Sequence, residues 1–166
     1  MLKLLLAFTL AIFSFPTQDA PPRKEKLVGT WKLVSAKITT DKGDVQDSWG
    51  PNPIGFLTYT ADGRMSAILT FSNRKSISNN DFISAPAAER AEAFATSTAY
   101  AGYFTLTGDK VTHHVEAATT PNDLGANLER VIVKLDADQL MLRVAKPYQR
   151  GGMMVRSQEL LWQRLK

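Results

Sequence analysis

The chain has 166 residues, of which 44% are hydrophobic and 22% are charged. This length supports one domain with its own core and is too short for two. The net charge of +4 comes from Lys and Arg residues spread thinly along the chain, which argues against nucleic-acid binding. Because the sequence contains no cysteine, disulfides, thiolate catalysis and a Cys-ligated zinc site are excluded.

The first 20 residues have the pattern of a secretory signal peptide. Lys3 gives a positive start, and a continuous apolar run extends from Leu4 to Phe15. This run is too short to span a bilayer, although an uncleaved membrane anchor is the alternative. We therefore expect a secreted or periplasmic protein, with no stable membrane insertion once residues 1–20 are removed. The polar, proline-rich segment 21–26 is predicted to be a linker before a folded domain at residues 27–166.

From Leu27 onward the chain has the pattern of short strands separated by turn residues. Asp62-Gly63 lies between two alternating runs, which is a strong hairpin signal. Gly108-Asp109 and the segment 136–139 divide two further pairs of strands in the same way. We count eight strands, joined mostly by tight turns between sequence neighbours. The sequence therefore predicts an all-β fold, an eight-stranded antiparallel up-and-down β-barrel with no exposed edges.

One α-helix is predicted between the third and fourth strands, within residues 84–100. Ser84 is the expected N-cap, Pro86 falls in the first turn, and the Ala, Glu and Arg content favours a helix. Phe94 is expected to dock this helix against the barrel. Together with the polar segment 72–81 before it, the helix is the natural gate of a barrel cavity.

The first strand begins with Gly29-Thr30-Trp31. Lys32 favours solvent on one face of this strand, so Trp31 points inward, and Gly29 leaves room for the bulky indole. A cation lying on the ring is the expected partner. Arg164 supplies it, because the last strand of a closed barrel pairs with the first. We predict that Gly29, Trp31 and Arg164 form a structural plug that seals one end of the barrel.

These residues resemble a known family. A Gly-x-Trp near the start and an arginine on the last strand are similar to the lipocalin (calycin) pattern. Stretches such as "LVGTWKLVSA" and "GPNPIGFLTYTADGRMSA" resemble a narrower group, the bacterial and fungal lipocalin-like domain family. The resemblance covers nearly the whole chain after Lys26, and the matching stretches are Leu27–Ala36, Gly50–Ala67, Ala99–Gly125 and Leu160–Arg164. It implies a barrel and a ligand cavity, without implying one activity, since related barrels include cyclases and binding proteins.

Both histidines of the chain lie side by side, at His113 and His114. Because side chains alternate along a strand, they point in opposite directions and cannot share one metal. Zinc needs at least three protein ligands, so we expect no metal site. His114 and Glu116 share a face, and inside an apolar cavity they are the candidate catalytic acid and base. Alternatively, the pair is a structural hydrogen bond of the barrel wall or faces solvent.

Other polar residues are candidates for binding a ligand alongside His114 and Glu116. They are Tyr59, Tyr103, Asn122 and Arg130. Each tyrosine hydroxyl could orient a ligand carbonyl while the ring supplies apolar contact. An inward Arg130 would need an anion or a carboxylate. The alternation of Val131, Val133 and Leu135 instead favours Glu129 inward, so the orientation of this strand stays open.

The sequence is best explained by a binding protein that encloses a small hydrophobic or aromatic molecule in the barrel, without a cofactor. One alternative is a cofactor-independent cyclase or isomerase that uses the pair His114 and Glu116 in the same cavity. Another is an interaction module whose barrel is packed solid with side chains. A cavity large enough for a ligand would separate the first two from the third. The oligomeric state stays open.

Overall fold

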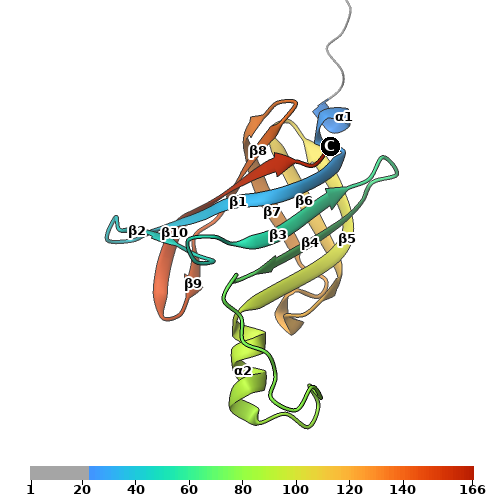
Figure 1. The fold of residues 1–166 in the computed structure, drawn as a ribbon. Coiled ribbons are helices and arrows are strands. Elements are labelled where there is room, and N and C mark those ends of the chain that lie inside the picture. Colours follow the sequence, from blue (N-terminus) through green and yellow to red (C-terminus); the bar gives the residue numbers. More distant parts are fainter. Residues whose placement is uncertain (1–22) are drawn as a thin grey trace, which may run out of the picture.

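The computed structural model describes residues 23–166, and the signal peptide expected at residues 1–20 lies outside the described residues. The described chain forms ten strands and three short helical segments (Figure 1). The strands are β1 (Gly29–Thr40), β2 (Val45–Asp47), β3 (Ile54–Tyr59), β4 (Arg64–Thr70), β5 (Ser97–Thr107), β6 (Lys110–Ala118), β7 (Asn127–Leu135), β8 (Gln139–Val144), β9 (Tyr148–Arg150) and β10 (Met153–Arg164). The helices are α1 (Arg23–Leu27), α2 (Ala87–Ala95) and the 3-10 helix η1 (Pro121–Asp123).

Eight of these strands close into an antiparallel barrel, which confirms the predicted fold class. They pair in the order β1-β3-β4-β5-β6-β7-β8-β10, and β10 pairs back onto β1. The two other strands, β2 and β9, have three residues each and lie beside the far ends of β1 and β10. Tight turns join sequence neighbours, as at Gly63, where a φ of 91° favours glycine.

Strict alternation along the strands builds the interior of the barrel. In β4, Met65, Ala67 and Leu69 are buried, while Ser66 and Ile68 between them are exposed. This period of two follows from the pleat of a strand, which sends successive side chains to opposite faces. The apolar sets of all eight barrel strands thus meet inside the barrel and form one continuous core.

The plug has the geometry that the sequence predicts. The guanidinium of Arg164 lies 4.0 Å from the centroid of the buried Trp31 ring. It also donates hydrogen bonds to the backbone carbonyls of Val28, at 2.7 Å, and Ala137, at 2.7 Å. Gly29 has a φ of 137°, and a Cβ built there would lie 2.3 Å from Nη1 of Arg164. A larger residue at this position would displace the cation and strain the backbone.

The segment predicted as a linker, residues 21–26, is partly helical, because α1 begins at Arg23 and ends at Leu27. Residues 23–26 are exposed, as their polar composition predicts. Leu27, the first residue of the predicted domain, is fully buried, and its carbonyl accepts a hydrogen bond from Nε1 of Trp31 at 2.9 Å. Lys24 lies over the ring of Phe104 at 5.7 Å. This short helix therefore completes the plug from outside (Figure 1).

The helix α2 lies between β4 and β5, where the sequence predicts it, but it differs in detail. It begins after Pro86 rather than at Ser84, whose hydroxyl donates instead to the carboxylate of Asp81. The expectation that Phe94 docks α2 against the barrel wall is wrong, since Phe94 is 56% exposed and α2 has no buried residue. Its alanine-rich surface offers little apolar area to bury, and α2 projects away from the strands (Figure 1). Within residues 23–166, no helix has the length and apolarity needed to cross a membrane.

Candidate ligand-binding site

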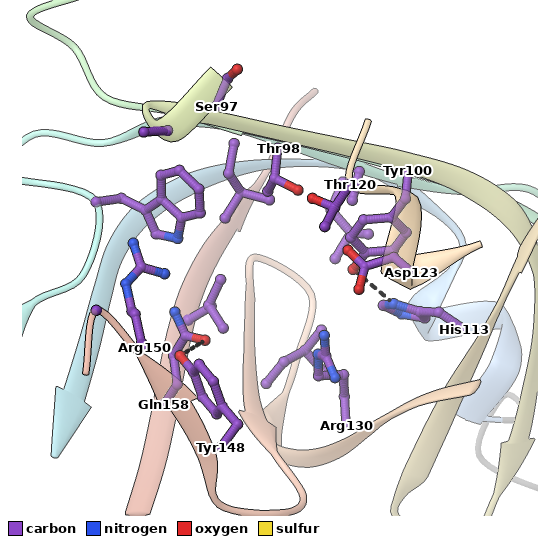
Figure 2. A pocket seen from close by; sticks show the side chains of 18 of the residues that line it. Ser97, Thr98, Tyr100, His113, Thr120, Asp123, Arg130, Tyr148, Arg150 and Gln158 are labelled. Carbon is purple, nitrogen blue, oxygen red and sulfur yellow. Dashed lines mark hydrogen bonds between the residues drawn. The ribbon is translucent and has the colours of Figure 1, made fainter. Parts of the chain in front are cut away.

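A cavity of about 640 Å³ lies inside the barrel (Figure 2). This volume is within the usual range for small-molecule sites and contradicts the alternative of a barrel packed solid. Inward residues of seven of the eight barrel strands line its walls, which combine apolar and aromatic side chains with a few polar ones. The apolar and aromatic lining residues in the walls are Trp49, Leu57, Ala67, Leu69, Leu142, Leu160 and Trp162.

One rim of the cavity comes from the elements around α2. Phe94 and Ala95 at the end of α2, and Ser97 and Thr98 at the start of β5, line the cavity, whereas none of the residues 72–81 does. The gate predicted from the sequence is therefore reduced to the end of α2 and the residues that follow it. The exposed ring of Phe94 is placed at this rim rather than in the protein core.

A hydrogen-bonded cluster of two buried side chains and one half-buried side chain lies against the cavity. His113 of β6 is only 1% exposed, and its Nε2 lies 2.6 Å from the hydroxyl of Tyr59 in β3. Its Nδ1 lies 3.0 Å from the hydroxyl of Tyr100 in β5. His113 and Tyr100 line the cavity, while Tyr59 lies behind them, packed edge-on against Phe104 at 4.8 Å. Three strands, β3, β5 and β6, thus hold one imidazole between two phenols.

Burial keeps this cluster uncharged. Desolvation holds the pKa of His113 well below its ordinary value of 6.5, and the positive charge of Arg130 lowers it further. Desolvation likewise raises the pKa of Tyr59 well above 10.0, and it raises the pKa of Tyr100. Near neutral pH, the imidazole is therefore neutral and both phenols keep their protons.

This pKa shift predicts that the protein loses stability in mild acid. In the unfolded chain His113 titrates near 6.5, so the unfolded state binds a proton that the folded state refuses. Above that pH the group contributes no pH dependence; as the pH falls below it, the free energy of unfolding decreases by up to about 1.4 kcal/mol per pH unit. Denaturant unfolding between pH 7 and pH 4.5 should show a shallower slope for His113→Gln than for the wild type. Superimposable slopes would contradict the assignment, because other groups facing His113, such as Asp123 and His114, are common to both proteins.

The structure settles the orientation of β7, which the sequence left open. Arg130 lines the cavity, whereas Glu129 reaches Lys146 outside it at 3.9 Å. The alternation that favoured Glu129 is misleading because the β7–β8 register shifts between Ile132 and Lys134. Val133 lies on the face opposite the buried Ile132 and is exposed, whereas the bulge turns Leu135 back toward the core, so the three apolar residues do not share one face.

The expectation that His114 and Glu116 line the cavity is wrong. Both lie on the outer face of the barrel wall, where Glu116 pairs with Arg64 and this contact lowers the pKa of its carboxyl. His114 bonds at 2.7 Å to the Oδ1 atom of Asn127 rather than to Glu116. The apolar neighbours Val111 and Val115 mark the inward face of β6, and His113 shares that face. The alternation of His113 with Val111 and Val115 therefore indicates His113, rather than His114, as the inward histidine.

Two further candidates also lie outside the cavity. Tyr103 is 42% exposed, and its ring stacks on the outer His114 with the centroids 4.4 Å apart. Gly102 and Phe104 on either side of it are buried, so the alternation places Tyr103 outward and indicates Tyr100 as the inward tyrosine. Asn122 is exposed in η1, and its neighbour Asp123 lines the cavity instead.

A second cluster of polar side chains on the cavity wall is not predicted by the sequence. Figure 2 shows Tyr148, Arg150 and Gln158 on the side of the cavity away from His113. The Tyr148 hydroxyl donates to Gln158 at 2.8 Å, and Arg150 lies over the ring of Trp49 at 5.0 Å. These residues belong to β9 and its neighbours, and β9 carries no strand signal that separates it from a loop. Among the described residues, no group of three His, Asp or Glu side chains is arranged to hold a metal ion.

Fold and cavity together define a closed eight-stranded antiparallel barrel with a hollow, partly polar interior. The lipocalin-like domain family matches residues 28–165, and the chain belongs to this family. No curated protein matches the sequence.

Solved structures with a similar fold share little sequence with this chain. A lipocalin-like protein from Bacteroides uniformis is 12% identical, with a TM-score of 0.44. An uncharacterized protein from Bacteroides eggerthii is 13% identical, with a TM-score of 0.43. A polyisoprenoid binding domain from Saccharophagus degradans is 7% identical, with a TM-score of 0.36. Each likeness covers 84% of this chain and 99% of the other.

Proposed function

We propose that the protein binds a small hydrophobic or aromatic molecule inside the barrel. The observation that carries this proposal is the cavity of about 640 Å³, whose walls combine leucine and tryptophan side chains with a few polar anchors. Apolar enclosure supplies most of the binding free energy at such sites, and the polar groups orient the ligand. The neutral state of His113 suits this role, because an uncharged cluster does not demand a counter-ion or water.

A buried donor in the wall supports the same proposal. Nε1 of Trp162 lies beneath the surface and has no hydrogen-bond partner among the described residues. A buried N–H without an acceptor costs about 1–3 kcal/mol. Trp162 lines the cavity, so this unsatisfied N–H belongs to the wall that a ligand would contact. The alternative that used His114 and Glu116 for acid–base catalysis in the cavity has no such support, because both residues lie outside it.

Filling the cavity should abolish binding of a neutral apolar dye. Ala67 in β4 is buried and lines the cavity, so the ring of an Ala67→Phe variant would occupy space that a ligand needs. We expect wild-type protein to enhance the fluorescence of N-phenylnaphthylamine, and the variant to bind the dye at least about tenfold more weakly, a loss of about 1.4 kcal/mol or more. Fluorescence titration measures both affinities.

The matched control is Ser66→Phe, which adds the same ring one residue earlier in β4, on the outer face of the barrel. This variant should bind the dye as the wild type does. Melting curves of both variants verify that they are folded. Equal dye binding by the two variants would contradict a site inside the barrel, and so would the absence of binding by the wild type.

A further inference from the structure

The cavity contains a guanidinium without a counter-ion. Arg130 is half-buried at the cavity wall, and none of the ion pairs within residues 23–166 includes it. Its Nη1 donates to the backbone carbonyl of Glu129 at 3.0 Å, which leaves other N–H groups of the fork for a ligand. A guanidinium removed from bulk water is stabilised best by a carboxylate that accepts two of its N–H groups.

The hydroxyl of Tyr100 is a second donor, and the hydrogen bonds of its neighbours determine where its proton points. The hydroxyl of Tyr59 is fully buried and its neighbour within hydrogen-bonding distance is Nε2 of His113, so Tyr59 must donate its proton there. The proton of the neutral imidazole is then on Nδ1, and it is donated to the oxygen of Tyr100. The proton of Tyr100 is not used in this series of hydrogen bonds. Because Tyr100 lines the cavity, it is available to an acceptor there.

Charge at this end of the cavity favours an anion. Figure 2 shows Tyr100, Asp123 and His113 close together, with Arg130 near them at the same end of the cavity. Arg130 lowers the pKa of Tyr100 by its positive charge, and this effect exceeds the opposite effect of the Asp123 carboxylate. Arg150 adds a second positive charge on the far wall, where its Nη2 donates to the carbonyl of Ser48 at 2.7 Å.

We propose that the ligand is an apolar carboxylic acid bound as its carboxylate, with Arg130 binding the two oxygens and Tyr100 donating a further hydrogen bond. This inference rests on the proposed function, since it assigns the chemistry of the molecule inside the barrel. The leucine and tryptophan walls receive the apolar body of the acid. Tyr59 and His113 are positioning residues, because they act on the ligand only by directing the Tyr100 proton into the cavity.

The test compares two probes of nearly the same shape, naphthylacetic acid, which is an anion at pH 7, and naphthylacetamide, which is neutral. Their binding to the wild-type protein is measured at pH 7 by quenching of tryptophan fluorescence, since Trp49 and Trp162 line the cavity. We expect the acid to bind about tenfold more tightly than the amide, the gain of one charge-assisted pair. In Arg130→Met, which keeps the length and apolar stem, the two probes should bind equally. Arg130→Lys keeps the charge without the fork and should keep part of the preference.

Arg143→Met is the matched control, because Arg143 pairs with Glu159 on the outer surface at 2.7 Å; this variant should retain the full preference for the acid. Equal binding of both probes by the wild type would overturn the carboxylate inference and leave the proposed function standing. A preference that persists in Arg130→Met would overturn the assignment to Arg130. If neither probe nor the neutral dye binds, the proposed function fails, and the inference fails with it.

Discussion

Replacing Trp31 with alanine is expected to lower the free energy of unfolding by about 3–5 kcal/mol. The ring is completely buried at the closed end of the barrel, and its removal leaves a cavity under the guanidinium of Arg164. The cation–π contact and the hydrogen bond from Nε1 to the carbonyl of Leu27 are lost at the same time. Domains of this size are stable by only about 5–15 kcal/mol. Thermal denaturation should therefore show a melting temperature lower by roughly 6–20 °C.

Tyr103→Ala is the control for this experiment, because it also truncates a large aromatic side chain on a barrel strand. Tyr103 lies on the outer face and contacts His114 by stacking, so its loss should cost less than about 1 kcal/mol. The difference between the two losses in free energy of unfolding separates the contribution of the plug from the general effect of losing an aromatic ring. Similar losses in both would mean that Trp31 does not close the barrel.

Replacing His113 with leucine should lower the free energy of unfolding by about 1–3 kcal/mol, measured by denaturant unfolding at pH 7. The variant leaves the buried hydroxyl of Tyr59 without its partner, and the desolvation of that hydroxyl is then uncompensated. The hydroxyl of Tyr100 loses a partner as well, but it can turn toward the cavity. Most of the loss therefore comes from Tyr59.

A double-mutant cycle separates this hydrogen bond from simple packing. Adding Tyr59→Phe to His113→Leu removes the orphaned hydroxyl, so the double variant should be more stable than the sum of the single losses by about 0.5–3 kcal/mol. The same cycle on the outer pair, His114→Leu with Tyr103→Phe, is the control, since that exposed pair is joined by ring stacking. Additive losses at His113 and Tyr59 would contradict the buried relay from Tyr59 to Tyr100.

The fold was predictable because its determinants are local. Alternation of apolar and polar residues marked the strands, and Asp62-Gly63 and Gly108-Asp109 marked the turns between them. Neighbouring strands joined by tight turns must lie antiparallel. A sheet of eight such strands has no exposed edge strand once it closes into a barrel. Trp31 and Arg164 could be paired because closure brings the last strand beside the first, at the register Trp31 to Arg164.

The site was predictable only in part. The choice of His114 followed chemical reasoning, since a histidine near the carboxylate of Glu116 is a familiar acid–base pair. The period of two nevertheless favoured His113, whose neighbours Val111 and Val115 are buried. The face of the strand on which a side chain lies decides whether it reaches the cavity, and its chemistry can act there only if it does.

The sequence by itself determined the barrel, its closed end and the presence of polar side chains on the strands. Only the tertiary structure decided which of those side chains meet. Arg130 and Leu135 both face inward although they are five residues apart, because a bulge in β7 lies between them and a one-residue shift in register reverses every facing after it. The contact of Tyr59 with His113 joins residues 54 positions apart through the curvature of the closed barrel. Local pattern specifies each strand, whereas the cavity arises from how eight strands are set against one another.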